Sequence, residues 1–125
     1  MRIDTRAHHD VVIVQPKDRL TVETAARFTE AIRTLLEAGS RHLVLNLVDV
    51  PYVDSDGLAA IVQAYTAARR RGGDLKLLHV KDRTRQLLAV TKLLTVFEAY
   101  DTEDEVARSF DADAEASFSS AVECC

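Results

Sequence analysis

The residues best suited to chemistry are a serine and two flanking carboxylates in the run Asp54-Ser55-Asp56-Gly57. The run follows a buried-strand pattern and precedes an amphipathic helical pattern, so we expect Ser55 at the start of a helix. A hydroxyl there lies among unpaired backbone N–H groups and near the positive end of the helix dipole. Such a position accommodates a phosphate, and the run therefore predicts a switch that acts through one hydroxyl.

The same run fits other interpretations. Asp and Ser before a helix are common N-caps, worth about 0.5–2 kcal/mol each, and on physical grounds alone a simple cap is the better interpretation. Asp-x-Asp-Gly after a strand also resembles the phosphatase motif of haloacid-dehalogenase-like enzymes. That motif needs an acidic pair downstream, where this chain has Asp74 alone, and Pro51 interrupts the strand. A serine-hydrolase elbow needs glycine at position 53, which is Val53.

Length and composition indicate one small globular domain. A chain of 125 residues fits a single core, and an apolar share of 47% with 29% charged residues is ordinary for a soluble protein. The net charge of −4 disfavours nucleic-acid binding. No apolar run approaches the ~20 residues that span a bilayer, and the polar start, residues 1–5, has no signal-peptide core. We expect a cytoplasmic protein that does not bind membranes.

Neither cysteines nor histidines predict a cofactor or metal. Cys124 and Cys125 lie at the C-terminus, so a disulfide there cannot stabilise the fold. Membrane attachment through a lipid on these cysteines would also lack its usual second signal, because no polybasic run precedes them. We expect exposed thiols on a solvated tail. The four histidines, His8, His9, His42 and His79, have no metal-ligand spacing. His42 and His79 lie at the start and near the end of expected strands, and we expect them to be structural.

Strand and helix patterns alternate along the chain. The expected strands are a weakly alternating edge at 3–9, then 11–14, 42–47, 75–80 and a short edge strand at 96–100. Helices are expected from an N-cap at Thr21 to Gly39, from Asp54 or Ser55 to about Arg71, over 84–93, and from Thr102 through Phe110. This order predicts an α/β fold with a mixed sheet of four to five strands and about four helices. The domain is expected to span residues 1–110, and residues 111–125 to form a frayed or disordered tail.

The helical spacing also predicts which side chains face the core. For the first helix these are Val22, Ala25, Ala26, Phe28, Ile32, Leu35 and Leu36. For the second they are Leu58, Ile61, Val62, Tyr65 and Ala68, and for the third Leu87, Leu88 and Val90. The strand at 42–47 is nearly continuously apolar, which is typical of a central strand buried on both faces.

These segments resemble a known family. The run Arg41-His42-Leu43-Val44-Leu45-Asn46-Leu47, followed by residues 50–58, is similar to the STAS domain of bacterial anti-sigma factor antagonists, in which a buried strand ends in Asn-Leu or Asp-Leu and Asp-Ser-Ser/Thr-Gly-Leu follows a short turn. Residues 88–97 and 99–105 resemble the family's third helix and last strand. The resemblance covers roughly residues 5–110 and implies a STAS-like fold.

The resemblance also implies a function. Such a protein binds an anti-sigma factor that is a kinase-like ATPase, and so frees a sigma factor for transcription. The kinase would phosphorylate Ser55 and a phosphatase would reset it, so the chain itself need not catalyse anything. A monomer or weak dimer is expected. The implied partner-binding residues are Asp18, Thr21, Asp54, Ser55, Asp56, Gly57 and Leu58.

Two positions depart from the family's pattern. Asp56 stands where Ser or Thr is usual and adds a permanent charge beside Ser55. In the loop after the early strand, Asp18 and Thr21 replace the usual Gly and Asp, and this loop is expected beside Ser55. Asp56 keeps a second function open, namely a STAS scaffold that is not phosphorylated, in a transport or sensory assembly.

Overall fold

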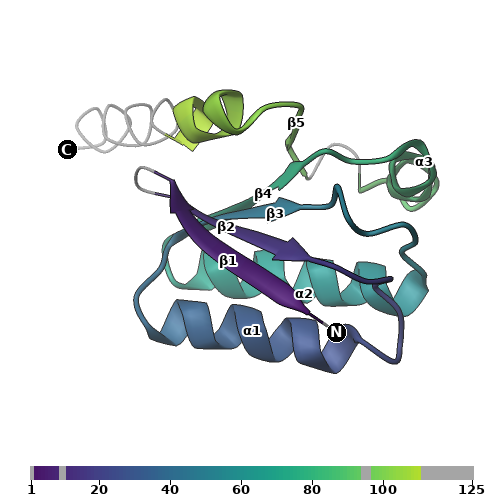
Figure 1. The fold of residues 1–125 in the computed structure, drawn as a ribbon, viewed down its shortest axis with the longest axis horizontal. Coiled ribbons are helices and arrows are strands. Elements are labelled where there is room, and N and C mark those ends of the chain that lie inside the picture. The colour runs from purple at the N-terminus through teal and green to yellow at the C-terminus, as the bar shows by residue number, and fades with distance from the viewer. Residues whose placement is uncertain (1, 9–10, 94–96, 111–125) are drawn as a thin grey trace.

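The computed structural model describes residues 2–8, 11–93 and 97–110, which form one five-stranded sheet with helices on both faces (Figure 1). The strand order is β1-β2-β3-β4-β5, with β1 antiparallel to β2 and the remaining neighbours parallel. The elements are β1 (Ile3–His8), β2 (Val11–Pro16), α1 (Ala25–Glu37), β3 (His42–Asn46), α2 (Ser55–Arg70), β4 (Asp74–Leu78), α3 (Asp82–Val90) and β5 (Ala99–Tyr100). Residues 103–110 are also helical and are called the C-terminal helix below. The expected mixed α/β sheet is confirmed.

The front face of the sheet, defined here as the face under α1 and α2, holds the larger core. Phe28, Ile32 and Leu36 recur every four residues along α1, so their side chains share one face of the helix and are buried. They pack with the apolar side of α2 and with alternate residues of the inner strands. The strand residues in this cluster include Val14, Leu43, Leu45, Leu75 and Leu77.

The back face holds a second, smaller cluster. Because side chains alternate along a strand, Val44 points away from its neighbour Leu45 and packs against the C-terminal helix. The cluster joins Val11, Ile13, Val44 and Leu78 of the sheet to Val106, Ala107 and Phe110. Residues 43–46 of β3 are all buried, as expected of a central strand between two covered faces.

Three predictions at helix ends were wrong. The first helix begins at Ala25, and Thr24, not Thr21, occupies the N-cap position. Val22 therefore lies in the turn before the helix and is 65% exposed. Val90 was expected to face the core, but it is the last residue of α3 and is 80% exposed. The helix ends at this residue, so no further turn packs Val90 against the core. The first helix ends before Gly39 as expected, and Gly39 takes a left-handed conformation with a φ of 103°, which glycine favours at such a helix end.

The remaining boundaries differ by a few residues. The strand expected at 75–80 spans Asp74–Leu78, and it ends there because His79 takes a positive φ of 57°. The edge strand expected over 96–100 is described as Ala99–Tyr100, and residues 94–96 lie outside the described part. Thr102 caps the C-terminal helix as predicted, because its Oγ1 accepts a hydrogen bond from the Glu105 N–H at 3.2 Å. The tail expected at 111–125 also lies outside the described residues.

Candidate functional site

Ser55 is the first residue of α2, and its side chain is exposed. Asp54 is the N-cap and is extended, with a ψ of −174°. Its Oδ1 accepts a hydrogen bond from the Gly57 N–H at 2.8 Å, and its carbonyl accepts one from Leu58 N–H at 2.8 Å. The cap therefore holds the first turn of α2 rigid while the adjacent hydroxyl faces solvent.

The loop after β2 is joined to the residues just before Ser55. Leu20 forms a parallel bridge with Val53. The Leu20 N–H donates to the Tyr52 carbonyl at 2.9 Å, and the Asp54 N–H donates to the Leu20 carbonyl at 3.2 Å. Two loops whose bridged residues, Leu20 and Val53, are 33 positions apart in sequence thus form one rigid surface around the start of α2.

Gly57 makes this contact possible. A methyl group on Gly57 would lie 2.0 Å from the Leu20 carbonyl oxygen, far inside van der Waals contact. The backbone of the loop therefore approaches α2 at the one position in the first turn that has no side chain. This close approach is the physical reason for a helix-destabilising residue at this position.

The residues of the loop are placed as follows. Asp18 is exposed, and its Oδ1 accepts a hydrogen bond from the Arg19 N–H at 2.7 Å. Thr21 is half-buried, and its N–H donates to Oγ1 of Thr24 at 3.0 Å. The Thr24 hydroxyl in turn donates to the Arg19 carbonyl at 2.7 Å. The structure thus brings Asp18 and Thr21 to the same end of the molecule as residues 54–58.

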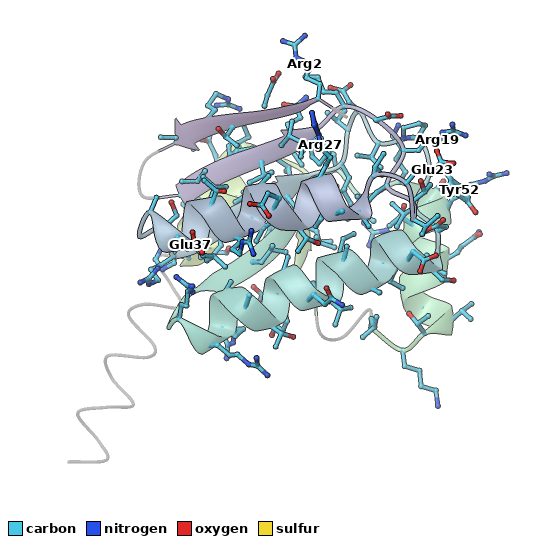
Figure 2. The ribbon with its side chains drawn as sticks, turned by 90° about the horizontal axis from the view of Figure 1, so that it is seen from below. Arg2, Arg19, Glu23, Arg27, Glu37 and Tyr52 are labelled. Atoms are coloured by element: carbon cyan, nitrogen blue, oxygen red, sulfur yellow. The ribbon has the colours of Figure 1, made fainter. Side chains whose placement is uncertain are left out.

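Exposed apolar side chains gather at this end. The large exposed hydrophobic residues of the described chain are Val22, Val48, Tyr52 and Val90. Each follows the carboxyl end of a parallel strand: one after β2, two after β3, and one on α3 after β4. Figure 2 shows Tyr52 with Arg19 and Glu23 at the end of the molecule where α1 begins. Exposed apolar residues clustered at one end are typical of a protein-binding surface.

Sequence reasoning did not include these apolar residues in the site. Val22 and Val90 continue the apolar spacing of their helices, so the pattern assigned them to the core. Val48 and Tyr52 flank Pro51 within the six residues before Asp54, and this position was the available signal.

A shallow groove of about 380 Å³ extends from Ser55 along α2. One wall is formed by α2 and the other by the segment that follows α3. The lining residues are Ser55, Leu58, Ala59, Val62, Gln63, Thr91 and Leu93. The groove continues the exposed apolar surface past the serine, so a bound protein can contact Ser55 and the apolar wall together.

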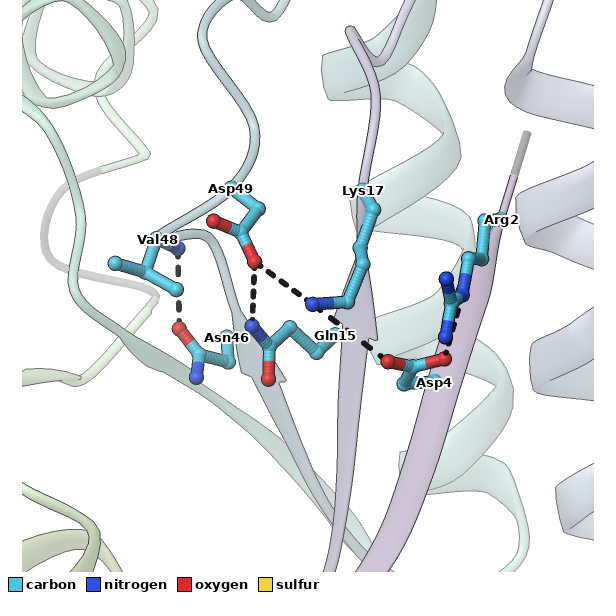
Figure 3. Close-up of polar contacts among 7 residues, drawn as sticks. All are labelled: Arg2, Asp4, Gln15, Lys17, Asn46, Val48 and Asp49. Carbon is cyan, nitrogen blue, oxygen red and sulfur yellow. Dashed lines mark hydrogen bonds and ion pairs between the residues drawn. The ribbon is translucent and has the colours of Figure 1, made fainter.

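A polar network fixes the turn that leads to the site (Figure 3). Asp49 accepts hydrogen bonds from Gln15 Nε2 at 2.6 Å and from Lys17 Nζ at 3.1 Å. These two contacts hold the pKa of the Asp49 carboxyl below its ordinary value. Asn46 Oδ1 accepts the Val48 N–H at 3.0 Å, which ends β3 and starts the turn. The backbone path from β3 to Asp54 is thereby anchored to β2.

The chemistry of this surface is that of an accessible hydroxyl in an acidic surrounding. Asp54 and Asp56 flank Ser55, and Asp56 is exposed in the first turn of α2. Within residues 2–8, 11–93 and 97–110, no group of three or more His, Cys, Asp or Glu residues is arranged to hold a metal. No helix in the same residues is long and apolar enough to cross a membrane.

Comparison with known proteins identifies the family. The model of the STAS domain matches residues 2–106. An anti-sigma F factor antagonist of Paenibacillus polymyxa is 26% identical over 108 residues, covering 82% of this chain and 89% of that protein. An anti-sigma-B factor antagonist of Staphylococcus epidermidis is 29% identical over 93 residues, covering 74% of this chain and 86% of that protein.

A solved structure agrees with these sequence matches. The crystal structure of a candidate anti-sigma factor antagonist from Thermotoga maritima superposes with a TM-score of 0.82 at 27% identity, over 87% of this chain and 94% of that one. The chain therefore belongs to the STAS domain family.

Proposed function

Starting from membership of the STAS family, whose anti-sigma factor antagonists are regulators rather than enzymes, we propose that this chain is an anti-sigma factor antagonist. It binds a kinase-type anti-sigma factor through the surface around Ser55, and phosphorylation of Ser55 switches that binding. The observation that carries the proposal is the exposed Ser55 hydroxyl at the head of α2, where the loops after β2 and β3 meet. The protein would work in the cytoplasm, where sigma factors act.

The apolar surface supports a protein partner. Tyr52 is 43% exposed and Val22 is 65% exposed, and both belong to loops that the Leu20 bridge holds together. The groove behind Ser55 offers the half-buried Val62 as a further apolar contact, whereas Leu58 also lines the groove but is only 5% exposed. Docking an anti-sigma factor here would cover the serine, so the bound state and the modified state exclude each other.

The switch would be electrostatic. A phosphoryl group adds about −1.5 to −2 charges at neutral pH. The Asp54 carboxylate is already engaged by the Gly57 N–H, and Asp56 is exposed, so both remain beside the new charge. Phosphorylation would therefore concentrate negative charge at the centre of the docking surface and repel carboxylates of the partner. The partner supplies ATP and the catalytic base, and a phosphatase would restore the hydroxyl.

The first test is phosphorylation. The anti-sigma factor is captured from the native host on the full chain, and the purified pair is incubated with ATP. Mass spectrometry is expected to find one added phosphoryl group on the wild type and none on Ser55→Ala. Ser40→Ala, at the opposite end of the molecule, is the matched control and should be labelled like the wild type. Labelling that persists in Ser55→Ala would contradict the assignment.

The second test is binding. We expect Ser55→Asp to weaken anti-sigma factor binding by ~10-fold or more, about 1.4 kcal/mol, while circular dichroism and the melting temperature stay as in the wild type. Thr66→Asp makes the same change of charge at an exposed position farther along α2, and it should bind as the wild type does. Equal affinity of wild type and Ser55→Asp would refute the docking surface.

Asp56 favours a second candidate function. Its permanent charge lies beside Ser55 at the start of α2, where a second anion is disfavoured. A STAS scaffold that is never phosphorylated, held in a sensory or transport assembly, is consistent with this residue. Stable co-purification with such an assembly, together with no phosphoryl transfer from any captured kinase, would favour the scaffold over the switch.

A further inference from the structure

We propose that two copies of this chain associate through β1, antiparallel and related by a two-fold axis at Thr5, so that their sheets become continuous. β1 is one end of the strand order, and no strand lies beyond it in the described part of the chain. It has six residues, whereas β5 at the other edge has two. A long edge strand offers backbone N–H and C=O groups with which a second strand can pair.

The ladder between β1 and β2 determines which backbone groups are available. The Lys17 N–H donates to the Arg2 carbonyl at 2.8 Å, so these two residues form a hydrogen-bonded pair. Such pairs alternate along an antiparallel ladder, and the register continues with Asp4 opposite Gln15 and Arg6 opposite Ile13. The even-numbered residues of β1 therefore direct N–H and C=O toward β2. Ile3, Thr5 and Ala7 direct theirs to the open edge.

A two-fold axis at Thr5 pairs all three outward-directed residues. Thr5 lies opposite the partner's Thr5, and Ile3 lies opposite the partner's Ala7, so each outward N–H and C=O finds a partner. The side chains of Asp4 and Arg6 then lie across from the partner's Arg6 and the partner's Asp4. Opposite charges at facing positions stabilise a strand pair, and like charges destabilise it.

Charge excludes the neighbouring symmetric registers. A two-fold axis at Asp4 would place the two Asp4 carboxylates opposite each other, and an axis at Arg6 would do the same with the two Arg6 guanidinium groups. Each also leaves one outward-directed residue without a partner. The sequence Ile3-Asp4-Thr5-Arg6-Ala7 is therefore self-complementary in one register only.

The charged side chains have room for these contacts. The Asp4 side chain is 45% exposed and lies 3.3 Å from Arg2 and 3.6 Å from Lys17 (Figure 3). The Arg6 side chain is 51% exposed and is paired with Glu103. A carboxylate accepts several hydrogen bonds and a guanidinium has five N–H donors, so both groups can bind a second partner. The association uses the edge of the sheet and leaves Ser55, at the start of α2, open to other proteins.

Sedimentation equilibrium of the full chain tests the proposal. The wild type is expected to show a concentration-dependent monomer–dimer equilibrium with a dissociation constant below about 1 mM. Thr5→Pro removes the outward N–H at the axis and leaves the β2 ladder intact, since proline is tolerated at such an edge position. We expect it to weaken association by ~10-fold or more. Thr5→Val keeps the N–H and should associate as the wild type does.

A charge exchange tests the register independently. Asp4→Arg places two positive side chains opposite each other in both cross-strand pairs and should abolish the dimer. Asp4→Arg combined with Arg6→Asp restores opposite charges in both pairs and should recover the dimer. A wild type that stays monomeric at every concentration would overturn the proposal. So would folded Thr5→Pro with unchanged association, or a double variant that dimerises no better than Asp4→Arg.

Discussion

The front face of the sheet is closed by two long helices, whereas the back face is closed in part by one short helix. Against the front face, α1 and α2 bury a continuous apolar cluster. On the back face, the C-terminal helix buries a smaller apolar cluster with polar groups at its border. Among these, the His42 ring stacks on the Phe110 ring at 4.8 Å between centroids. The front face thus supplies most of the burial that stabilises the fold, and the back face attaches one additional element.

Lys76 makes the contrast sharpest. Its side chain is 1% exposed on the back face, and Nζ lies 2.8 Å from Glu98 Oε2. The same ammonium donates to Ser109 Oγ at 2.9 Å and lies 4.5 Å from the centre of the Phe110 ring. One buried cation therefore joins β4 to the segment before β5 and to the C-terminal helix. Among the buried residues of the described part of the chain, Lys76 is the one that carries a charge.

The largest expected effect is on the front face. Leu45→Ala or Ile61→Ala removes a fully buried side chain that two helices and the sheet surround, so the cavity cannot collapse. We expect a loss of about 2–5 kcal/mol in the free energy of unfolding, measured by urea denaturation. Leu78→Ala makes the same truncation at a fully buried residue of the back cluster, so it is the matched control and should cost less. Equal losses would mean that the two faces contribute equally.

Phe110→Ala should have a smaller and more local effect. The ring is 2% exposed and contacts His42 and Lys76, but it belongs to the last helix described. We expect a loss of about 1–3 kcal/mol, because the C-terminal helix can detach while the front core stays folded. Hydrogen exchange should then be faster in residues 106–110 and unchanged in β3. Faster exchange in both would show one cooperative unit.

Substitution of Lys76 separates its charge from its packing. Lys76→Met keeps the apolar stem and removes the ammonium, whose partner Glu98 has a half-exposed side chain that water can solvate. We expect a change in the free energy of unfolding of less than about 1 kcal/mol. Lys76→Ala also removes the buried stem and should cost about 1–2 kcal/mol more. If the two variants are equally destabilised, the ion pair rather than the stem holds the C-terminal helix.

The smallest effect concerns the polar network that Asp49 forms with Gln15 and Lys17. The hydrogen bond from Gln15, and then that from Lys17, lower the pKa of Asp49 from its ordinary 3.8. A carboxyl whose pKa is lower in the folded state stabilises the fold above 3.8 and loses that contribution as pH falls through the folded value. Asp49→Asn should therefore be slightly less stable than wild type near neutral pH, and the difference should vanish in acid. Thermal melts across the acid range measure it, and a difference that grows as pH falls would refute the assignment.

The central part of the fold was predictable from local patterns. The apolar run at 42–47 predicted a strand buried on both faces, and residues 43–46 are buried. Asp54 before a helical pattern predicted a cap, and its carboxylate accepts the Gly57 N–H. In both cases the determining interactions are within a few residues or follow from strand and helix periodicity, so sequence alone contains the information.

Helix ends were less predictable. Val22 and Val90 have the right apolar spacing, yet both are exposed. Periodicity gives the orientation of a side chain but not the residue at which the helix stops. At α1 the start is set by hydrogen bonds in the loop, where Thr24 rather than Thr21 bonds the Arg19 carbonyl.

The sequence by itself determined the alternation of strands and helices, the mixed sheet and a serine at the start of α2, because these depend on periodicity and capping. Only the tertiary structure decided that Leu20 bridges Val53 against Gly57, that exposed apolar residues lie at the end of the molecule that carries Ser55, and that Lys76 lies buried under the C-terminal helix. Each of these joins segments far apart in the chain. A residue's neighbours across such distances are set by how helices and strands pack, which no local pattern encodes.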